Sequence, residues 1–108
     1  MKQILKFEVE LDENQLPVNM EMHASDGVTE TDIKALMISA WASKSKETLR
    51  IDLWTKDMPV NDMLIMYHQT MMGMAATLER ATGHNKLADA LLDYCSFFVE
   101  QTKIKDAK

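Results

Sequence analysis

The sequence predicts an α+β fold, in which a four-stranded antiparallel β-meander is followed by two antiparallel helices packed on one face of the sheet. In the first half of the chain apolar and polar side chains alternate with the period of a strand; after Pro59 the period becomes helical, and Gly83 interrupts it once. At 108 residues, 46% of them hydrophobic, the chain is expected to form a single domain over residues 1–108.

The first two strands are predicted over residues 2–11 and 17–24. From Leu5 to Leu11 every second residue is apolar and the residues between are charged, which is typical of a strand with one buried face. The second segment alternates in the same way. Because only a short polar stretch separates the two, we expect an antiparallel hairpin.

The third strand is predicted over residues 33–42. A helix within residues 29–43 is the alternative, because Thr29 and Asp32 could form a capping box at a helix N-terminus. The strand is favoured because the apolar run ends in a polar loop of hairpin length. That loop leads directly into the next predicted strand, at residues 48–56.

The fourth strand and the two helices complete the prediction. Leu49, Ile51 and Leu53 alternate with polar or aromatic neighbours and are expected to face the helices. Pro59 suits the start of a helix, predicted over residues 59–82. Gly83 is expected to end it in a left-handed conformation, and a second helix follows over residues 85–103.

The outer face of the predicted sheet is the candidate site. Arg50, Asp52 and Trp54 must point away from the helices, and the third strand is apolar on both faces. Its register therefore places either Leu36 and Ile38 or Met37 and Trp41 beside Trp54. An apolar half-face of this kind indicates an interface with a second copy or a partner protein, unless the chain's own termini cover it. The candidate partner-binding residues are Arg50, Asp52, Trp54, Leu36 and Ile38.

No catalytic, cofactor-binding or metal-binding residue is predicted, and the protein is not expected to be an enzyme. A helical metal site at His68 would need a second ligand three or four residues away, where the sequence has apolar residues. Cys95 has no histidine at helical spacing to activate it. Glu8 and Glu10 share a strand face, which is interpreted as a solvated surface with cross-strand ion pairs.

The charge of the chain excludes some partners. With 12 basic and 17 acidic residues the net charge is −5, and without a basic run nucleic acid is not an expected partner. No apolar window approaches the ~18 residues of a membrane-spanning helix, so direct membrane insertion is not expected. The N-terminus lacks an apolar stretch of signal-peptide length, which favours a cytoplasmic protein.

Residues 48–60, together with residues 79–83, resemble the family of the gliding motility-associated protein GldC of Bacteroidetes. Residues 6–14 and 34–41 are also similar to that family, so the resemblance covers nearly the whole chain. The resemblance implies a cytoplasmic accessory protein of the gliding apparatus with no catalytic residue, metal or cofactor, and it does not imply a molecular mechanism. From the exposed sheet face we expect this accessory to be an adaptor that binds a protein partner, such as a motility or envelope component. The residues that match the signature segments are Arg50, Asp52, Trp54, Lys56, Asp57, Glu79 and Arg80.

The predicted architecture also suggests a second function. Four meandering strands with two antiparallel helices are the layout of SecB-type export chaperones, which are acidic, cytoplasmic and oligomeric. An acidic protein with an apolar sheet face and ten methionines could hold unfolded secretory clients. Under either function we expect a homo-oligomer, most simply a dimer.

Overall fold

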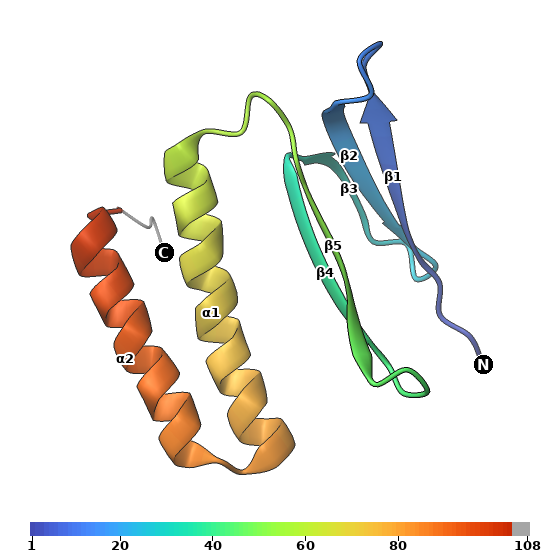
Figure 1. Ribbon diagram of the computed structural model, residues 1–108. Coiled ribbons are helices and arrows are strands. Elements are labelled where there is room, and N and C mark those ends of the chain that lie inside the picture. Colours follow the sequence, from blue (N-terminus) through green and yellow to red (C-terminus); the bar gives the residue numbers. More distant parts are fainter. Residues whose placement is uncertain (105–108) are drawn as a thin grey trace. The chain divides into compact units, whose positions relative to one another are not determined.

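The computed structural model describes residues 1–104. The chain forms two compact units, Met1–Met58 and a second unit that begins at Pro59. Within the described residues the first unit contains five strands and the second contains two helices, as labelled in Figure 1. The α+β class and the antiparallel strands predicted from the sequence are therefore confirmed.

Three strands form an antiparallel sheet in the order β1–β2–β3. They are β1 (Leu5–Leu11), β2 (Pro17–Ala24) and β3 (Thr29–Ile33). The turn between β1 and β2 is closed by Asp12, whose Oδ1 accepts hydrogen bonds from the backbone amides of Asn14 and Leu16 at 2.8 and 3.0 Å. This local bonding produces the predicted hairpin.

The other two strands form a separate hairpin. Strand β4 (Ala35–Ala42) pairs antiparallel with β5 (Glu47–Trp54), and the register places Ile38 opposite Ile51. In the connecting turn the amide of Lys46 donates to the carbonyl of Ala42 at 2.9 Å, and Lys46 itself has a φ of 60°. A positive φ is uncommon for a non-glycine residue. The geometry of the turn in a hairpin fixes how its strands pair, so this turn fixes the register of β4 and β5.

The predicted four-stranded meander is wrong in its strand count and sheet arrangement. The strand predicted over residues 33–42 corresponds to β4, whereas β3, which ends at Ile33 and is separated from β4 by Lys34, was not predicted. Strand β3 pairs with β2, whereas β4 has β5 as its sole strand partner within residues 1–104. The helical alternative for residues 29–43 is also wrong. The packing of the helices on one face of a sheet stays a prediction.

Lys34 connects the two sheets of the first unit. Its backbone carbonyl accepts a hydrogen bond from the amide of Thr55 at 2.9 Å, which extends the β4–β5 ladder by one pair. Thr55 is 1% exposed, and its hydroxyl donates to Asp57 Oδ1 at 2.6 Å. Among the described residues, no side chain caps the start of the helix that follows Pro59.

The second unit is an antiparallel pair of helices, α1 (Val60–Thr82) and α2 (Asn85–Thr102). Ala75 on α1 and Ala88 on α2 are buried, and side chains this small let two helices approach closely. Gly83 ends α1 with a φ of 70°, and its amide donates to the carbonyl of Glu79 at 2.8 Å. The predicted left-handed glycine cap is confirmed. Among residues 1–104, neither helix has the length and apolarity needed to cross a membrane.

Replacement of Gly83 by alanine is expected to destabilise the protein by about 1 kcal/mol, because a side chain disfavours the left-handed backbone. No atom lies within 4 Å of an added Cβ, so the cost is conformational rather than steric. Gly73→Ala is the matched control in the middle of α1, where an added Cβ also meets no atom within 4 Å. There alanine is expected to stabilise by roughly 0.5–1 kcal/mol. Urea unfolding of both variants measures the two changes in the free energy of unfolding. Changes of the same sign in the two variants would contradict this prediction.

Candidate functional site

The β4–β5 hairpin presents two faces of different chemistry. Because neighbouring side chains alternate between faces, the register assigns each residue of the two strands. One face, here called the Arg50 face, consists of Ala35, Met37, Ser39, Trp41, Thr48, Arg50, Asp52 and Trp54. The opposite face, here called the Ile51 face, consists of Leu36, Ile38, Ala40, Ala42, Glu47, Leu49, Ile51 and Leu53.

The five candidate residues from the sequence do not all lie together. Arg50, Asp52 and Trp54 share the Arg50 face, as predicted, whereas Leu36 and Ile38 lie on the Ile51 face with the apolar residues of β5. Of the two arrangements left open by the sequence, the structure has the one that places Met37 and Trp41 on the same face as Trp54.

A bidentate ion pair lies in the middle of the Arg50 face. Arg50 donates to Asp52 through Nη2, at 2.6 Å from Oδ1, and through Nε, at 3.2 Å from Oδ2. Its Nη1 donates to the Ser39 hydroxyl across the hairpin. Both charged side chains are about half exposed, so the pair adds little to stability. Its effect is to hold the guanidinium in one orientation.

Two exposed tryptophans flank this ion pair. Trp41 is opposite Thr48 near the turn, and Trp54 is opposite Ala35 at the other end of the hairpin. Their exposed fractions are 63% and 59%. Tryptophan and arginine are the residue types most enriched where one protein binds another strongly. The Arg50 face therefore has the composition of a protein-binding surface.

A shallow depression of about 290 Å³ adjoins Trp54. It is lined by Leu16, Pro17, Asp52, Leu53, Trp54 and Lys56. Lys56 Nζ lies 3.2 Å from Asp12 Oδ2 near this depression. The volume is at the lower limit of small-molecule sites, and its lining of apolar side chains suits one side chain of a partner better than a metabolite.

Hydrogen bonds lower the pKa of two carboxyl groups in the first unit. For Asp12 the main cause is the backbone amide of Leu16, with further contributions from Lys56 and the amide of Asn14. For Asp57 the main cause is the hydroxyl of Thr55, with the charge of Lys34 also lowering the pKa. Each bond stabilises the ionised form of its carboxyl.

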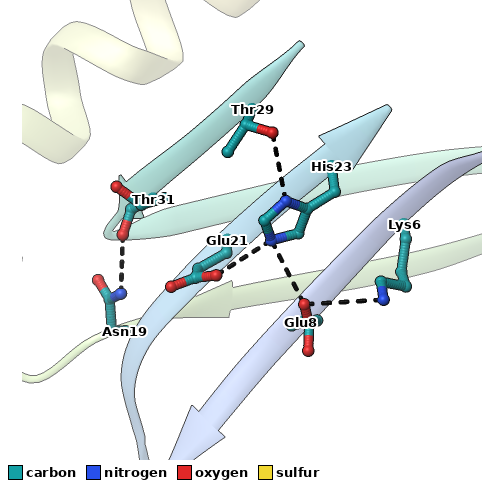
Figure 2. A network of polar contacts seen from close by, with 7 residues as sticks. All are labelled: Lys6, Glu8, Asn19, Glu21, His23, Thr29 and Thr31. Atoms are coloured by element: carbon teal, nitrogen blue, oxygen red, sulfur yellow. Dashed lines mark hydrogen bonds and ion pairs between the residues drawn. The ribbon is translucent and has the colours of Figure 1, made fainter. Parts of the chain in front are cut away.

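A polar cluster lies on the three-stranded sheet (Figure 2). His23 Nε2 is 3.0 Å from Glu21 Oε1 and 3.3 Å from Glu8 Oε1, while its Nδ1 is 3.3 Å from the Thr29 hydroxyl. Lys6 Nζ approaches the same Glu8 oxygen at 3.8 Å. These side chains come from three neighbouring strands, and the register places Glu8 directly opposite Glu21.

Glu8, Glu21 and His23 are the residues with metal-ligand geometry in the described part of the chain, with their ligand atoms within 4.8 Å of one another. Two carboxylates facing each other are unfavourable, and a cationic neighbour relieves the repulsion. Lys6 supplies that charge beside Glu8, and the His23 ring lies within hydrogen-bond distance of Glu21 and the Thr29 hydroxyl, so the cluster is explained as a local polar network. The sequence analysis missed it. The available signal was Glu21 and His23 on one strand face, opposite Glu8 across the predicted hairpin.

Comparison with protein families identifies the chain. The model of the family described as "Gliding motility-associated protein GldC-like" matches residues 17–104. The chain belongs to the GldC-like family. The matched region includes the whole β4–β5 hairpin and both helices, whereas β1 precedes it. Neither the curated proteins nor the solved structures provide a match to this chain.

The other two histidines and Cys95 lie in the helical unit of this GldC-like protein. His84 is the N-cap of α2, where its Nδ1 accepts a hydrogen bond from the amide of Leu87 at 3.3 Å. His68 stacks on Phe98 with ring centroids 6.4 Å apart. Burial raises the pKa of the Cys95 thiol, which disfavours the nucleophilic thiolate.

Trp54→Ala is expected to change the free energy of unfolding by less than about 1 kcal/mol, because exposed substitutions remove little buried area. Met20→Ala is the control for a core position, since Met20 is 0% exposed, and should cost roughly 2–5 kcal/mol. Urea unfolding measures both. A loss at Trp54 as large as that at Met20 would place the tryptophan in the core instead.

The stability of the protein is expected to fall in acid as Asp12 and Asp57 become protonated. Both groups have a folded-state pKa below the ordinary value of 3.8. The two carboxylates therefore make their full contribution to the free energy of unfolding above pH 3.8. That contribution is lost as the pH falls through their lower folded-state pKa values. Urea unfolding as a function of pH measures the loss, and Asp57→Asn should make it smaller. An unchanged pH dependence in the variant would contradict the role of Asp57.

Proposed function

We propose that this GldC-like protein is a non-enzymatic, cytoplasmic accessory protein of the Bacteroidetes gliding motility system that acts by protein–protein interaction. The family match associates the chain with gliding motility. The adaptor role rests on one observation: Trp41 and Trp54 are exposed on the Arg50 face on either side of the Arg50–Asp52 ion pair.

The expected occupant of the Arg50 face is one folded partner, such as a motility or envelope component. Flat aromatic side chains lose little conformational entropy on binding and bury a large area. The arginine between them is already oriented by Asp52 and Ser39, so less freedom is lost when it binds a carboxylate of the partner. The depression beside Trp54 can receive one apolar side chain of the partner.

A non-enzymatic role agrees with the chemistry of the remaining side chains. The Cys95 thiol is buried with a raised pKa, and the imidazole of His84 is engaged by a backbone amide. His23 is engaged by two carboxylates and a hydroxyl. A general base needs a free nitrogen within reach of a substrate proton, whereas both nitrogens of His23 and the Nδ1 of His84 have local partners.

A SecB-like export chaperone is the second candidate function, favoured by the exposed apolar side chains of the opposite face. Leu49 and Ile51 are 58% and 52% exposed on the Ile51 face. An unfolded secretory chain could bind such a surface through its own apolar side chains. The two functions differ in stoichiometry, because an adaptor binds one folded partner and a chaperone binds many clients weakly.

Native affinity purification from the host, followed by mass spectrometry with intensity-based stoichiometry, distinguishes the two functions. The adaptor function predicts one dominant folded partner, which Trp54→Ala should lose while the melting temperature stays nearly unchanged. Phe97→Ala, which removes an aromatic residue 51% exposed on α2, is the matched control and should retain the partner.

Other results would contradict the adaptor proposal. A broad set of unfolded precursor proteins, retained by Trp54→Ala, would instead support the chaperone function. Retention of a single folded partner by Trp54→Ala would exclude the Arg50 face as its binding surface. Normal gliding of cells that lack the protein would contradict a role in motility.

A further inference from the structure

The outer edge of β5 carries unsatisfied hydrogen-bonding capacity. Within residues 1–104, β5 pairs with β4 and with no other strand. It is eight residues long and contains no proline, bulge or lysine, three of the devices by which proteins protect an exposed edge. A two-stranded hairpin is marginally stable by itself, so pairing of this edge with another strand is favourable.

The phase of the β4–β5 ladder identifies the groups at this edge. The amide of Thr55 donates to the carbonyl of Lys34, so these two residues form a hydrogen-bonded pair. Such pairs recur at every second residue of an antiparallel ladder. The odd-numbered residues of β5 therefore bond to β4. The even-numbered residues, Thr48, Arg50, Asp52 and Trp54, direct their amide and carbonyl groups away from β4.

The charges on β5 are complementary to a second copy of β5 in one antiparallel register. When Ile51 lies opposite the partner's Ile51, Arg50 lies opposite the partner's Asp52 and the converse holds by symmetry, so the Arg50–Asp52 pair within each chain becomes part of a network of four charges. Every one of the four outward-facing residues then has an outward-facing residue opposite it. Shifting the two-fold axis by one residue would place Arg50 opposite Arg50 or Asp52 opposite Asp52, which like-charge repulsion disfavours.

The same register also matches the Ile51 face. Leu49 lies opposite the partner's Leu53, and Ile51 lies beside its own copy. Because Leu36 and Ile38 already flank β5 on this face, the two hairpins would form a four-stranded sheet with one continuous apolar face. The pairing thereby buries part of Leu49 and Ile51, which are more than half exposed in one chain.

We propose that two copies of the chain associate through the outer edge of β5, around a two-fold axis at Ile51, with reciprocal ion pairs between Arg50 and the partner's Asp52. The occupant of this edge is therefore a second copy of the chain. The inference concerns the strand edge and does not depend on the motility partner. If the chains do not associate through β5, the proposed adaptor function is not contradicted.

Charge-reversal variants test the register. Light scattering coupled to size-exclusion chromatography should give the wild type twice the 12.4 kDa mass of one chain. Arg50→Asp and Asp52→Arg each place like charges opposite each other across the axis, and each should weaken association at least roughly ten-fold. Lys86→Asp, an equal change of charge on the exposed surface of α2, is the control and should keep the wild-type mass.

Recombination of the two variants separates the proposed register from misfolding. The Arg50→Asp chain has aspartate at positions 50 and 52, and the Asp52→Arg chain has arginine at both. When the two chains are mixed, each aspartate lies opposite an arginine, so a heterodimer should form. The double variant should restore the homodimer, because it exchanges the two charges. A monomeric wild type at high concentration, dimeric single variants, or a mixture that stays monomeric would each overturn the proposal.

Discussion

The antiparallel register of β4 and β5 is the constraint on which the candidate site depends. It places Ser39 opposite Arg50, so that the serine hydroxyl and the Asp52 carboxylate together orient the guanidinium. It also brings both tryptophans onto one face and leaves the other face aliphatic. A slip of one residue would exchange the faces of one strand and separate Trp41 from Trp54. The turn between the two strands, with Lys46 in the left-handed region, therefore positions the candidate site as well as the strands.

The sequence predicts those parts of the fold for which local signals agree. Strict alternation identifies β1 and β5, and Gly83 separates the helices because the left-handed conformation favours glycine. The division at Lys34 is not predictable from alternation, because β3 is polar and exposed along most of its length. Its pairing with β2 is set by tertiary contacts. The faces of β4 are ambiguous for the opposite reason, since Leu36, Met37, Ile38 and Trp41 make both of them apolar.

The site is less predictable than the fold, because it consists of relations between strands. Arg50, Asp52 and Trp54 are correctly placed on one face, since residues two apart in a strand share a side of the sheet. Ser39 enters the site only through the pairing of β4 with β5. Similarly, the contact of His23 with Glu8 requires the register of β1 and β2. The alternation of residues along one strand predicts neither of these two contacts between strands.

Every strand pairing in the first unit joins strands that are neighbours in sequence: β1 with β2, β2 with β3, and β4 with β5. Contacts between sequence neighbours close short loops, which costs little chain entropy and permits rapid folding. During synthesis, this unit has all of its strand partners before the first residue of α1 is added to the chain. The β hairpins can therefore form on the ribosome in the order in which they are made, each without waiting for a distant segment.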